Sequence, residues 1–235
     1  MYKNKKVSVV FSTYNEKDSV RGCIEGLFRT GYVDEVIAVD NNAVAGTKDE
    51  IKKTKASYFH EKHQGFGYGF QRALRESTGD ILIMIEPDGT FDPQDIVHLL
   101  RCSDSFDVVF GTRTNSRAAS GKAHMSFLLR QGNYALAKLV SILFRAPPLT
   151  DVGCTYRLIK RKAYDELRER FTVMGDIFNL DMMLHVVKNK IPYTEVSIRY
   201  LKRIGVSSLS GNFLRSISIG FAMFFLILKF RLGFR

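Results

Sequence analysis

Strand-like and helix-like segments alternate through the first half of this chain, and that alternation constrains the fold more than any other feature. Short apolar segments rich in β-branched residues are separated by segments with helical spacing or polar composition. A strand, a helix-length connection and another strand together predict a parallel sheet with right-handed crossovers. We therefore predict an α/β fold with a mostly parallel sheet flanked by helices. The expected strands are residues 7–11, 35–39, 56–60, 81–85 and 107–110, and the expected helices are residues 19–29, 46–54, 70–77 and 93–100.

The pattern loosens after residue 111. Residues 126–144 and 178–188 have the composition of helices, whereas residues 150–157 are expected to form a loop that enters a strand. Residues 198–210 are irregular and basic. Because no internal repeat or low-complexity linker interrupts the chain, we expect one domain over residues 1–210 and an appended helix over residues 211–235.

Polar clusters follow three of the expected strands. They are residues 14–16 (Tyr-Asn-Glu), 40–42 (Asp-Asn-Asn) and 86–88 (Glu-Pro-Asp). Open α/β sheets bind ligands in the crevice beyond the carboxyl ends of their strands. The three clusters therefore predict a ligand site on one edge of the sheet.

Glu86 and Asp88 are the strongest candidates for chemistry, because they follow the most apolar strand. Two carboxylates two residues apart on a turn can present oxygen ligands to one hard cation such as Mg²⁺ or Mn²⁺. Such a cation would hold the phosphates of a nucleotide diphosphate and neutralise the leaving group. The alternative is a pair of ordinary acidic turn residues, which are common.

The net charge is +11, and the positive charge is concentrated in two acid-free segments. Residues 108–150 carry six Lys/Arg, residues 196–235 carry seven, and neither segment contains Asp or Glu. Such segments suit the phosphates of nucleotides, lipids or nucleic acids, although a solvated basic surface is the alternative. The basic residues flank apolar helices and no nucleic-acid motif is present, so we expect no nucleic-acid partner.

The expected tail helix has an uncharged, almost wholly apolar stretch, residues 219–228, between Arg215 and a basic end containing Lys229, Arg231 and Arg235. A helix that spans a bilayer needs about 20 apolar residues, and this stretch is shorter. We expect it to lie at the membrane interface, with its cations on lipid headgroups. The alternatives are a helix packed on the protein's own core and a tilted span.

The remaining patterns carry less weight. Cys23, Cys102 and Cys154 are far apart and form no CxxC pair, which suits a reducing compartment. With no signal peptide expected, we predict a catalytic part on the cytoplasmic face of a membrane. The glycines of residues 65–69 lack dinucleotide-binding spacing and are expected to form a turn into a helix. His60 and His63 lack a third ligand nearby and are expected to be polar loop residues.

Several motifs occur in the order found in family 2 glycosyltransferases, which have the GT-A fold. The resemblance covers roughly residues 6–210, and it is greatest to dolichol-phosphate mannosyltransferases and their bacterial polyprenyl-phosphate relatives. The motifs are residues 9–16 (VVFSTYNE), 40–42 (DNN), 63–69 (HQGFGYG), 77–80 (STGD), 86–88 (EPD), 111–113 (GTR) and 151–154 (DVGC).

The resemblance implies an inverting transferase that uses a UDP- or GDP-sugar and a divalent metal ion. It implies that Tyr14 and Glu16 line the nucleotide pocket and that Asp40 hydrogen-bonds the base. Asp88 would be the main metal ligand, with Glu86 as its partner. The family usually has Asp-x-Asp at this turn, so the longer side chain of Glu86 also leaves open a catalytically degenerate membrane-surface binding protein.

The resemblance also implies roles at the acceptor side. Arg113 and Arg130 would clamp the donor diphosphate or the acceptor phosphate, and Arg203, in residues 203–208, would close over the site. Asp176 or Asp181 would be the base for a sugar-hydroxyl acceptor. A lipid phosphate is already ionised near neutral pH and needs no strong base, so the acceptor is either a polyprenyl phosphate or a glycan hydroxyl.

Overall fold

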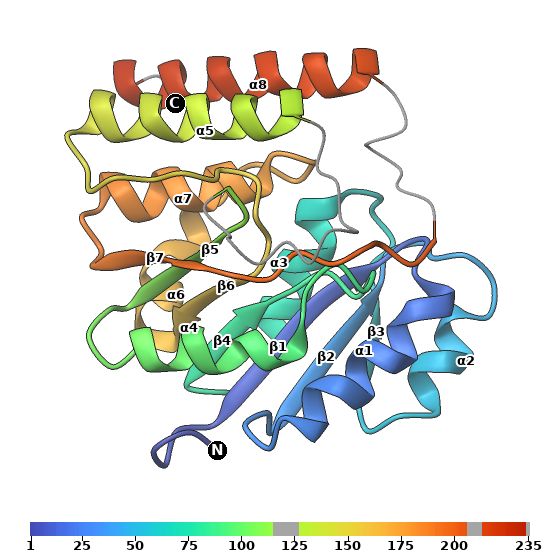
Figure 1. The fold of residues 1–235 in the computed structure, drawn as a ribbon. Helices are drawn as coiled ribbons and strands as arrows, with labels where there is room; N and C mark the ends of the chain where they lie inside the picture. Colours follow the sequence, from blue (N-terminus) through green and yellow to red (C-terminus); the bar gives the residue numbers. More distant parts are fainter. Residues whose placement is uncertain (115–126, 206–212, 234–235) are drawn as a thin grey trace.

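A seven-stranded mixed sheet forms the centre of the molecule and is covered by helices on both faces (Figure 1). The computed structural model describes residues 1–114, 127–205 and 213–233. The strand order is β3-β2-β1-β4-β6-β5-β7. The strands are β1 (Val7–Thr13), β2 (Glu35–Asp40), β3 (Ser57–His60), β4 (Ile81–Met84), β5 (Val108–Thr112), β6 (Arg157–Lys160) and β7 (Tyr193–Ser197).

The predicted α/β fold with a mostly parallel sheet is confirmed. Strands β1 to β4 pair in parallel, and β5 pairs in parallel with β7. Strand β6 runs antiparallel to both β4 and β5. Buried apolar side chains line the central strands; every residue of β4 is buried, as its uninterrupted apolar sequence predicts.

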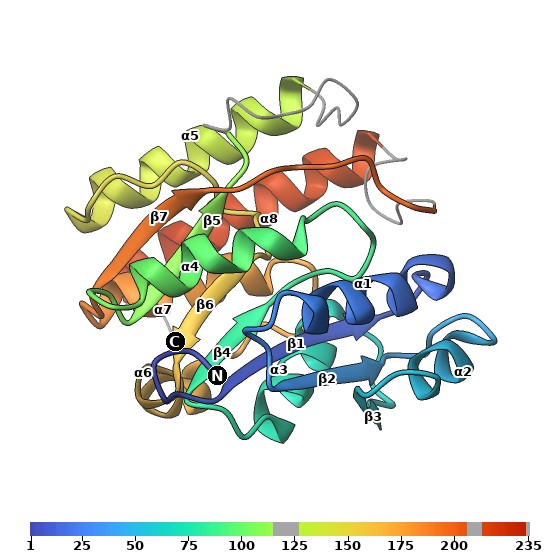
Figure 2. The same ribbon diagram turned by 60° about the horizontal axis from the view of Figure 1, so that its bottom comes forward.

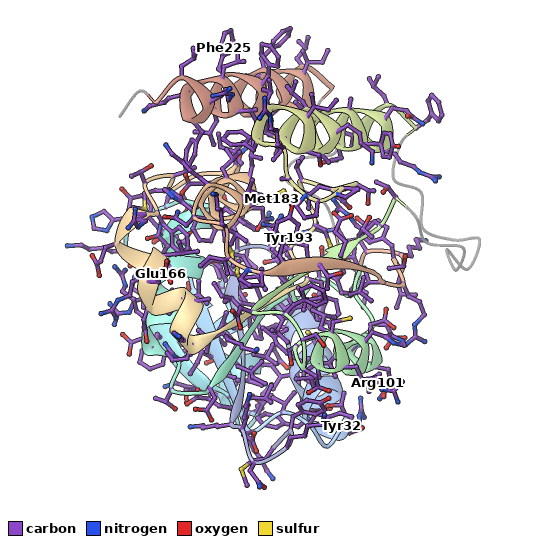
Figure 3. The ribbon with its side chains drawn as sticks, turned by 90° about the vertical axis from the view of Figure 1, so that its left-hand side faces the viewer. Tyr32, Arg101, Glu166, Met183, Tyr193 and Phe225 are labelled. Atoms are coloured by element: carbon purple, nitrogen blue, oxygen red, sulfur yellow. The ribbon has the colours of Figure 1, made fainter. Side chains whose placement is uncertain are left out.

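Helices pack on opposite faces of this sheet. Figure 2 shows α1 and α4 on one face and α3 on the other. In Figure 3, Arg101 of α4 and Glu166 of α6 project from opposite faces. The helices are α1 (Lys17–Arg29), α2 (Thr47–Lys52), α3 (Phe66–Glu76), α4 (Ile96–Cys102), α5 (Phe127–Phe144), α6 (Arg161–Leu167), α7 (Phe178–Lys188) and α8 (Phe213–Leu232), with short 3-10 turns η1 (Pro93–Asp95) and η2 (Arg168–Arg170).

The two longest helices, α5 and α8, lie side by side as an outer layer over α7 (Figure 1). Met223 and Ile227 of α8 are buried against the protein, whereas Phe221 and Phe225 are 61% and 63% exposed. Figure 3 shows Phe225 pointing away from the body of the molecule. The tail helix therefore packs on the core through one face and leaves an apolar face uncovered. Its expected boundary at residue 210 lies outside the described residues.

The segment that follows β7 crosses the sheet edge beyond the carboxyl ends of β1 and β4 (Figure 1). The Leu201 amide donates to the Thr90 carbonyl oxygen at 2.7 Å, and the Ile204 amide donates to the Asp88 carbonyl oxygen at 2.8 Å. Gly89 has a φ of +81°, and the Ile204 side chain lies where a Cβ would project. These contacts hold the segment against the turn between β4 and η1, where the acidic pair lies.

Candidate active site

Residues from three distant segments meet at the carboxyl edge of the sheet. The guanidinium of Arg203 lies 3.0 Å from Glu16 Oε1 and 2.9 Å from Asp88 Oδ2. Glu16 is held in place because its Oε2 accepts hydrogen bonds from the backbone amides of Tyr14, at 2.6 Å, and Asn15, at 2.9 Å. The structure thus brings Glu16, Asp88 and Arg203 into one cluster. The rest of the expected late loop, Val206–Ser208, lies outside the described residues.

Asp88 is buried, and its two oxygens have different surroundings. Oδ1 accepts from the Thr90 amide at 2.9 Å and from the Thr90 hydroxyl at 2.5 Å. Oδ2 faces Arg203 and has no well-formed hydrogen bond from any described residue. A buried carboxylate oxygen engaged only through a cation is suited to exchange that cation for another.

Glu86 lies on the same turn, and a residue from a different segment holds its carboxylate. The Thr155 hydroxyl donates to Glu86 Oε1 at 2.6 Å. Burial, and after it the neighbouring negative charge of Asp88, raises the pKa of Glu86 to about 7. Two carboxylates that destabilise each other's charge in this way favour the uptake of a cation.

These two carboxylates fit a hard divalent cation. No cluster of three or more His, Cys, Asp or Glu side chains forms within the described ranges. Mg²⁺ and Mn²⁺ sites that handle nucleotides commonly use one or two carboxylates, with the substrate phosphates and water completing the coordination. Asp88 and Glu86 match that donor set, and Asp88 Oδ2 is the better-placed ligand.

Arg113 is rigidly oriented by a fully buried carboxylate. Its Nε lies 2.8 Å from Asp151 Oδ2, its Nη2 lies 2.9 Å from Oδ1, and its backbone amide also donates to Oδ2. Burial alone would raise the pKa of Asp151, but the charge of Arg113 and the hydrogen bonds from Arg113 and Gly153 together hold that pKa below its usual value. The guanidinium also lies 5.4 Å from the centre of the Tyr200 ring, in the segment that crosses the site.

Arg130 lies on the first turn of α5 and connects to the same region. Its Nη2 donates to the Thr114 carbonyl oxygen at 2.7 Å, one residue beyond Arg113. Phe127 and Leu128, on the same turn of α5, are 77% and 56% exposed. An exposed apolar helix end therefore carries Arg130, which is linked through Thr114 to the segment of Arg113.

Asp40 and Tyr14 lie at the ends of β2 and β1. Asp40 Oδ1 accepts from the Ala43 amide at 2.8 Å, and Oδ2 accepts from the Tyr58 hydroxyl at 2.9 Å. Tyr14 is 44% exposed. These two side chains border the edge of the sheet beside Glu16, but their roles toward a nucleotide stay predictions.

The segment rich in glycine is shaped by Asn41, a residue that the sequence placed in a polar cluster without a role. Its Nδ2 donates to the carbonyl oxygens of Glu61 and His63, and its Oδ1 accepts from the Gly65 amide at 2.9 Å. A Cβ on Gly67 would lie 2.6 Å from the Val173 carbonyl oxygen. The segment is thus the tight turn into α3 that the sequence predicts.

The structure separates Asp176 from Asp181. Asp176 is partly exposed and lies 3.1 Å from Arg215 Nη2 of α8. Asp181 is fully buried and accepts from the amides of Thr172 and Val173 at 3.2 and 3.4 Å. Neither carboxylate contacts Glu86 or Asp88 in the described part of the chain.

Asp181 should make stability depend on pH. Burial raises its pKa from 3.8 to about 6, so the folded state holds its proton over a range in which the unfolded chain has released it. Its contribution to stability is therefore largest below pH 4 and is lost as the pH rises through 6, a change of about 3 kcal/mol.

We expect Asp181→Asn to gain stability relative to wild type as the pH rises from 4 to 7, by up to about 3 kcal/mol. Urea unfolding at each pH measures this difference. His185 lies 3.6 Å away and has a pKa that burial lowers to about 4, so the comparison is repeated in a His185→Gln background to separate its titration from that of Asp181. A stability difference that does not change with pH would show that Asp181 ionises normally.

Sequence analysis missed Thr155, Asn179 and Tyr200 as neighbours of the site. Asn179 Nδ2 donates to Thr155 Oγ1 at 2.8 Å, and Thr155 in turn donates to Glu86. The available signals were the position of Thr155 next to the DVGC motif and that of Asn179 between the two candidate bases; Tyr200 had none.

An α/β sheet of this topology, with an acidic pair and arginines at its carboxyl edge, defines the glycosyltransferase class. The model of the family described as glycosyl transferase family 2 matches residues 8–168. The chain belongs to this family, as its motifs predict.

Named relatives agree with this assignment. The chain is 24% identical to a dolichyl-phosphate hexose transferase of Haloferax volcanii over 205 residues, which cover 86% of each protein. It is also 24% identical to an undecaprenyl-phosphate mannosyltransferase of Micrococcus luteus over 226 residues, or 88% of each protein. The predicted resemblance to the polyprenyl-phosphate branch is confirmed.

Solved structures share the fold. Glucosyl-3-phosphoglycerate synthase from Mycobacterium tuberculosis, crystallised with Mn²⁺, UDP and phosphoglyceric acid, superposes with a TM-score of 0.73. The match covers 99% of this chain and 80% of that one, at 15% sequence identity. The GT-A architecture expected from the sequence is therefore confirmed.

Proposed function

We propose that this glycosyltransferase moves a hexose from a nucleotide-diphosphate sugar to a polyprenyl phosphate at a membrane surface. The carrying observation is that Arg130 shares the first turn of α5 with the exposed apolar residues Phe127 and Leu128 and bonds to the carbonyl of Thr114, the residue that follows Arg113. Arginines suit a phosphate, and apolar side chains suit a prenyl chain. The polyprenyl-phosphate relatives favour the same acceptor.

On the donor side, Asp88 and Glu86 would hold Mg²⁺ or Mn²⁺, which when bound neutralises negative charge on the departing nucleoside diphosphate. Arg203 bridges Glu16 and Asp88, so it is positioned to turn from these carboxylates to the donor diphosphate. Tyr14, Glu16 and Asp40 would border the nucleoside. Donor identity is open between UDP- and GDP-sugars.

On the acceptor side, the phosphate oxygen would attack the anomeric carbon with inversion. Arg113, held bidentately by Asp151, would orient that phosphate, and Arg130 would share its charge. A phosphate arrives ionised, so no side chain has to remove a proton. This agrees with the positions of Asp176 and Asp181, which do not contact the acidic pair.

The test is a product analysis with Mn²⁺, a panel of UDP- and GDP-hexoses, and two acceptors. Wild-type protein is incubated with a polyprenyl phosphate in detergent or with an oligosaccharide, and products are identified by mass spectrometry. We expect a polyprenyl phosphohexose from one donor. Extension of the oligosaccharide instead would support the glycan-hydroxyl alternative, and no product with any pair would favour the degenerate-site alternative.

The variant Asp176→Asn distinguishes a phosphate acceptor from a sugar-hydroxyl acceptor, which needs a base. With a phosphate acceptor we expect kcat to stay within about threefold of wild type, whereas removal of a required base costs about 10²–10⁴-fold. Steady-state kinetics on the product found above measures this. A loss of a hundredfold or more, with an unchanged melting temperature, would contradict the phosphate acceptor.

A membrane surface is part of this proposal. Leu214, Phe221 and Phe225 of α8 and Ile142 of α5 are each more than 60% exposed. In the described residues no helix is long and apolar enough to cross a bilayer. Together with the basic flanks of α8, these exposed side chains favour a protein that lies on the cytoplasmic face of a membrane.

We expect Phe221→Ser combined with Phe225→Ser to weaken binding to anionic lipid vesicles by tenfold or more, because two large apolar side chains no longer leave water on binding. Vesicle sedimentation measures the affinity. Val44→Ser, an exposed apolar residue after β2, is the control and should bind as wild type does. If the double variant bound vesicles as tightly as wild type, the exposed face of α8 would not be part of the membrane contact.

A further inference from the structure

A buried chain of hydrogen bonds leads from α7 to the acidic pair. Asn179 Nδ2 donates to Thr155 Oγ1 at 2.8 Å, and Thr155 Oγ1 donates to Glu86 Oε1 at 2.6 Å. Thr155 is fully buried and Asn179 is 4% exposed. These side chains come from segments that are 69 and 24 residues apart in sequence, so only the fold brings them together.

The direction of this chain is determined by its chemistry. The Asn179 amide nitrogen can only donate, and it also lies 3.4 Å from the Gly153 carbonyl oxygen, which can only accept. The Thr155 oxygen therefore accepts from Asn179, which leaves its single hydrogen for Glu86. Glu86 Oε1 therefore accepts the hydrogen bond that the Thr155 hydroxyl donates.

The scaffold around the chain is rigid. Arg157 is buried and donates to the carbonyl oxygens of Val152, Cys154 and Asn179. One guanidinium therefore fixes the backbone just before Thr155 and at Asn179. By contrast, Asn179 Oδ1 is buried without a hydrogen-bond partner in the described structure, so the polar contribution of this side chain comes from its amide hydrogens.

We propose that Thr155 and Asn179 are positioning residues for Glu86, which they hold by Oε1 so that its other oxygen faces a divalent cation shared with Asp88. The inference rests on the proposed metal-dependent transfer and names residues that set the cation affinity. Outer residues that orient a metal ligand typically change metal affinity by about 10–100-fold when they are removed. Glu86 has a longer side chain than aspartate and needs such support more, because it has an additional rotatable bond.

The test is a titration of Mn²⁺ followed by electron paramagnetic resonance, which counts free Mn²⁺ without requiring catalysis. Thr155→Val keeps the shape of the side chain and removes its hydroxyl, so we expect Mn²⁺ to bind about tenfold or more weakly. Thr155→Ser restores the hydroxyl and should bind within about threefold of wild type. Thr47→Val is the matched control: its hydroxyl is also buried, but it donates to the Val44 carbonyl oxygen.

The variant Asn179→Leu tests whether Asn179 positions Glu86 or only stabilises the fold. Leucine removes the donor to Thr155 and also the unpartnered oxygen, so the melting temperature should be retained or raised while Mn²⁺ affinity falls. Wild-type affinity in both Thr155→Val and Asn179→Leu would overturn the inference and leave the proposed function intact. Failure of the wild-type protein itself to bind Mn²⁺ would overturn both the metal site and the inference.

Discussion

Asp88→Asn is expected to lower kcat/KM by about 10³-fold or more while the fold is retained. Asparagine can still accept the Thr90 hydrogen bonds through its oxygen, so the turn should keep its shape. The variant lacks the negative charge that attracts a cation to Oδ2, and the charge stabilisation supplied by a metal ion is worth several kcal/mol. A loss of about 4 kcal/mol corresponds to a factor of about 10³ in rate.

The measurement is steady-state kinetics with the donor and acceptor identified by product analysis. Asp165→Asn is the matched control, because Asp165 lies on α6, is about half exposed and, among the described residues, pairs only with Arg168 at 3.9 Å. It should have wild-type kinetics. Substantial activity in Asp88→Asn, at a wild-type melting temperature, would mean that Asp88 is not a metal ligand.

Asp151→Asn is expected to lower the free energy of unfolding by about 3–5 kcal/mol. Asp151 is fully buried and holds Arg113, whose side chain is only 11% exposed. The substitution removes the carboxylate that balances this buried charge. In a chain of this size the loss corresponds to a fall in melting temperature of about 10 °C.

Thermal and urea unfolding measure this loss. Asp107→Asn is the control, because Asp107 pairs with Lys160 at 2.9 Å but is 42% exposed, and exposed pairs contribute about 0.2–1 kcal/mol. The Asp151 variant should also lose acceptor affinity, since Arg113 is no longer oriented. A destabilisation of less than 1 kcal/mol would show that Arg113 has other compensation for its charge.

Much of the fold could be predicted because local patterns decide it. The buried strand β4 is wholly apolar, β1 and β2 have apolar centres, and the first helix, between β1 and β2, has helical spacing. The antiparallel direction of β6 could not be predicted, because its four residues, Arg157–Lys160, are compatible with either direction. Its orientation is decided by long-range pairing with β4 and β5.

The same distinction between local patterns and long-range contacts applies to the residues of the site. Glu86 and Asp88 are neighbours in sequence, so their common turn was visible from the start. The link from Arg203 to Glu16 joins residues 187 positions apart, and only the family resemblance suggested that the late segment closes over the site. Thr155 and Asn179 are ordinary polar residues without a motif of their own, so their contact with the acidic pair depends on tertiary structure.

For the tail helix α8, the sequence left two environments open. The apolar composition of α8 was compatible with a membrane surface and with the protein's own core. In the structure one face of the helix packs on the core, where Met223 and Ile227 are buried, and another is uncovered, where Phe221 and Phe225 are exposed. Composition alone does not separate the two faces of a helix that is apolar on nearly all sides.

Calorimetric titration with UDP and GDP, each with and without Mn²⁺, tests the central claim most directly. It is performed on wild type and on Asp88→Asn. We expect one nucleotide to bind wild type only when Mn²⁺ is present and to bind the variant at least tenfold more weakly. Binding that is independent of Mn²⁺, or that is equal in the two proteins, would contradict a metal-assisted donor site at Glu86 and Asp88.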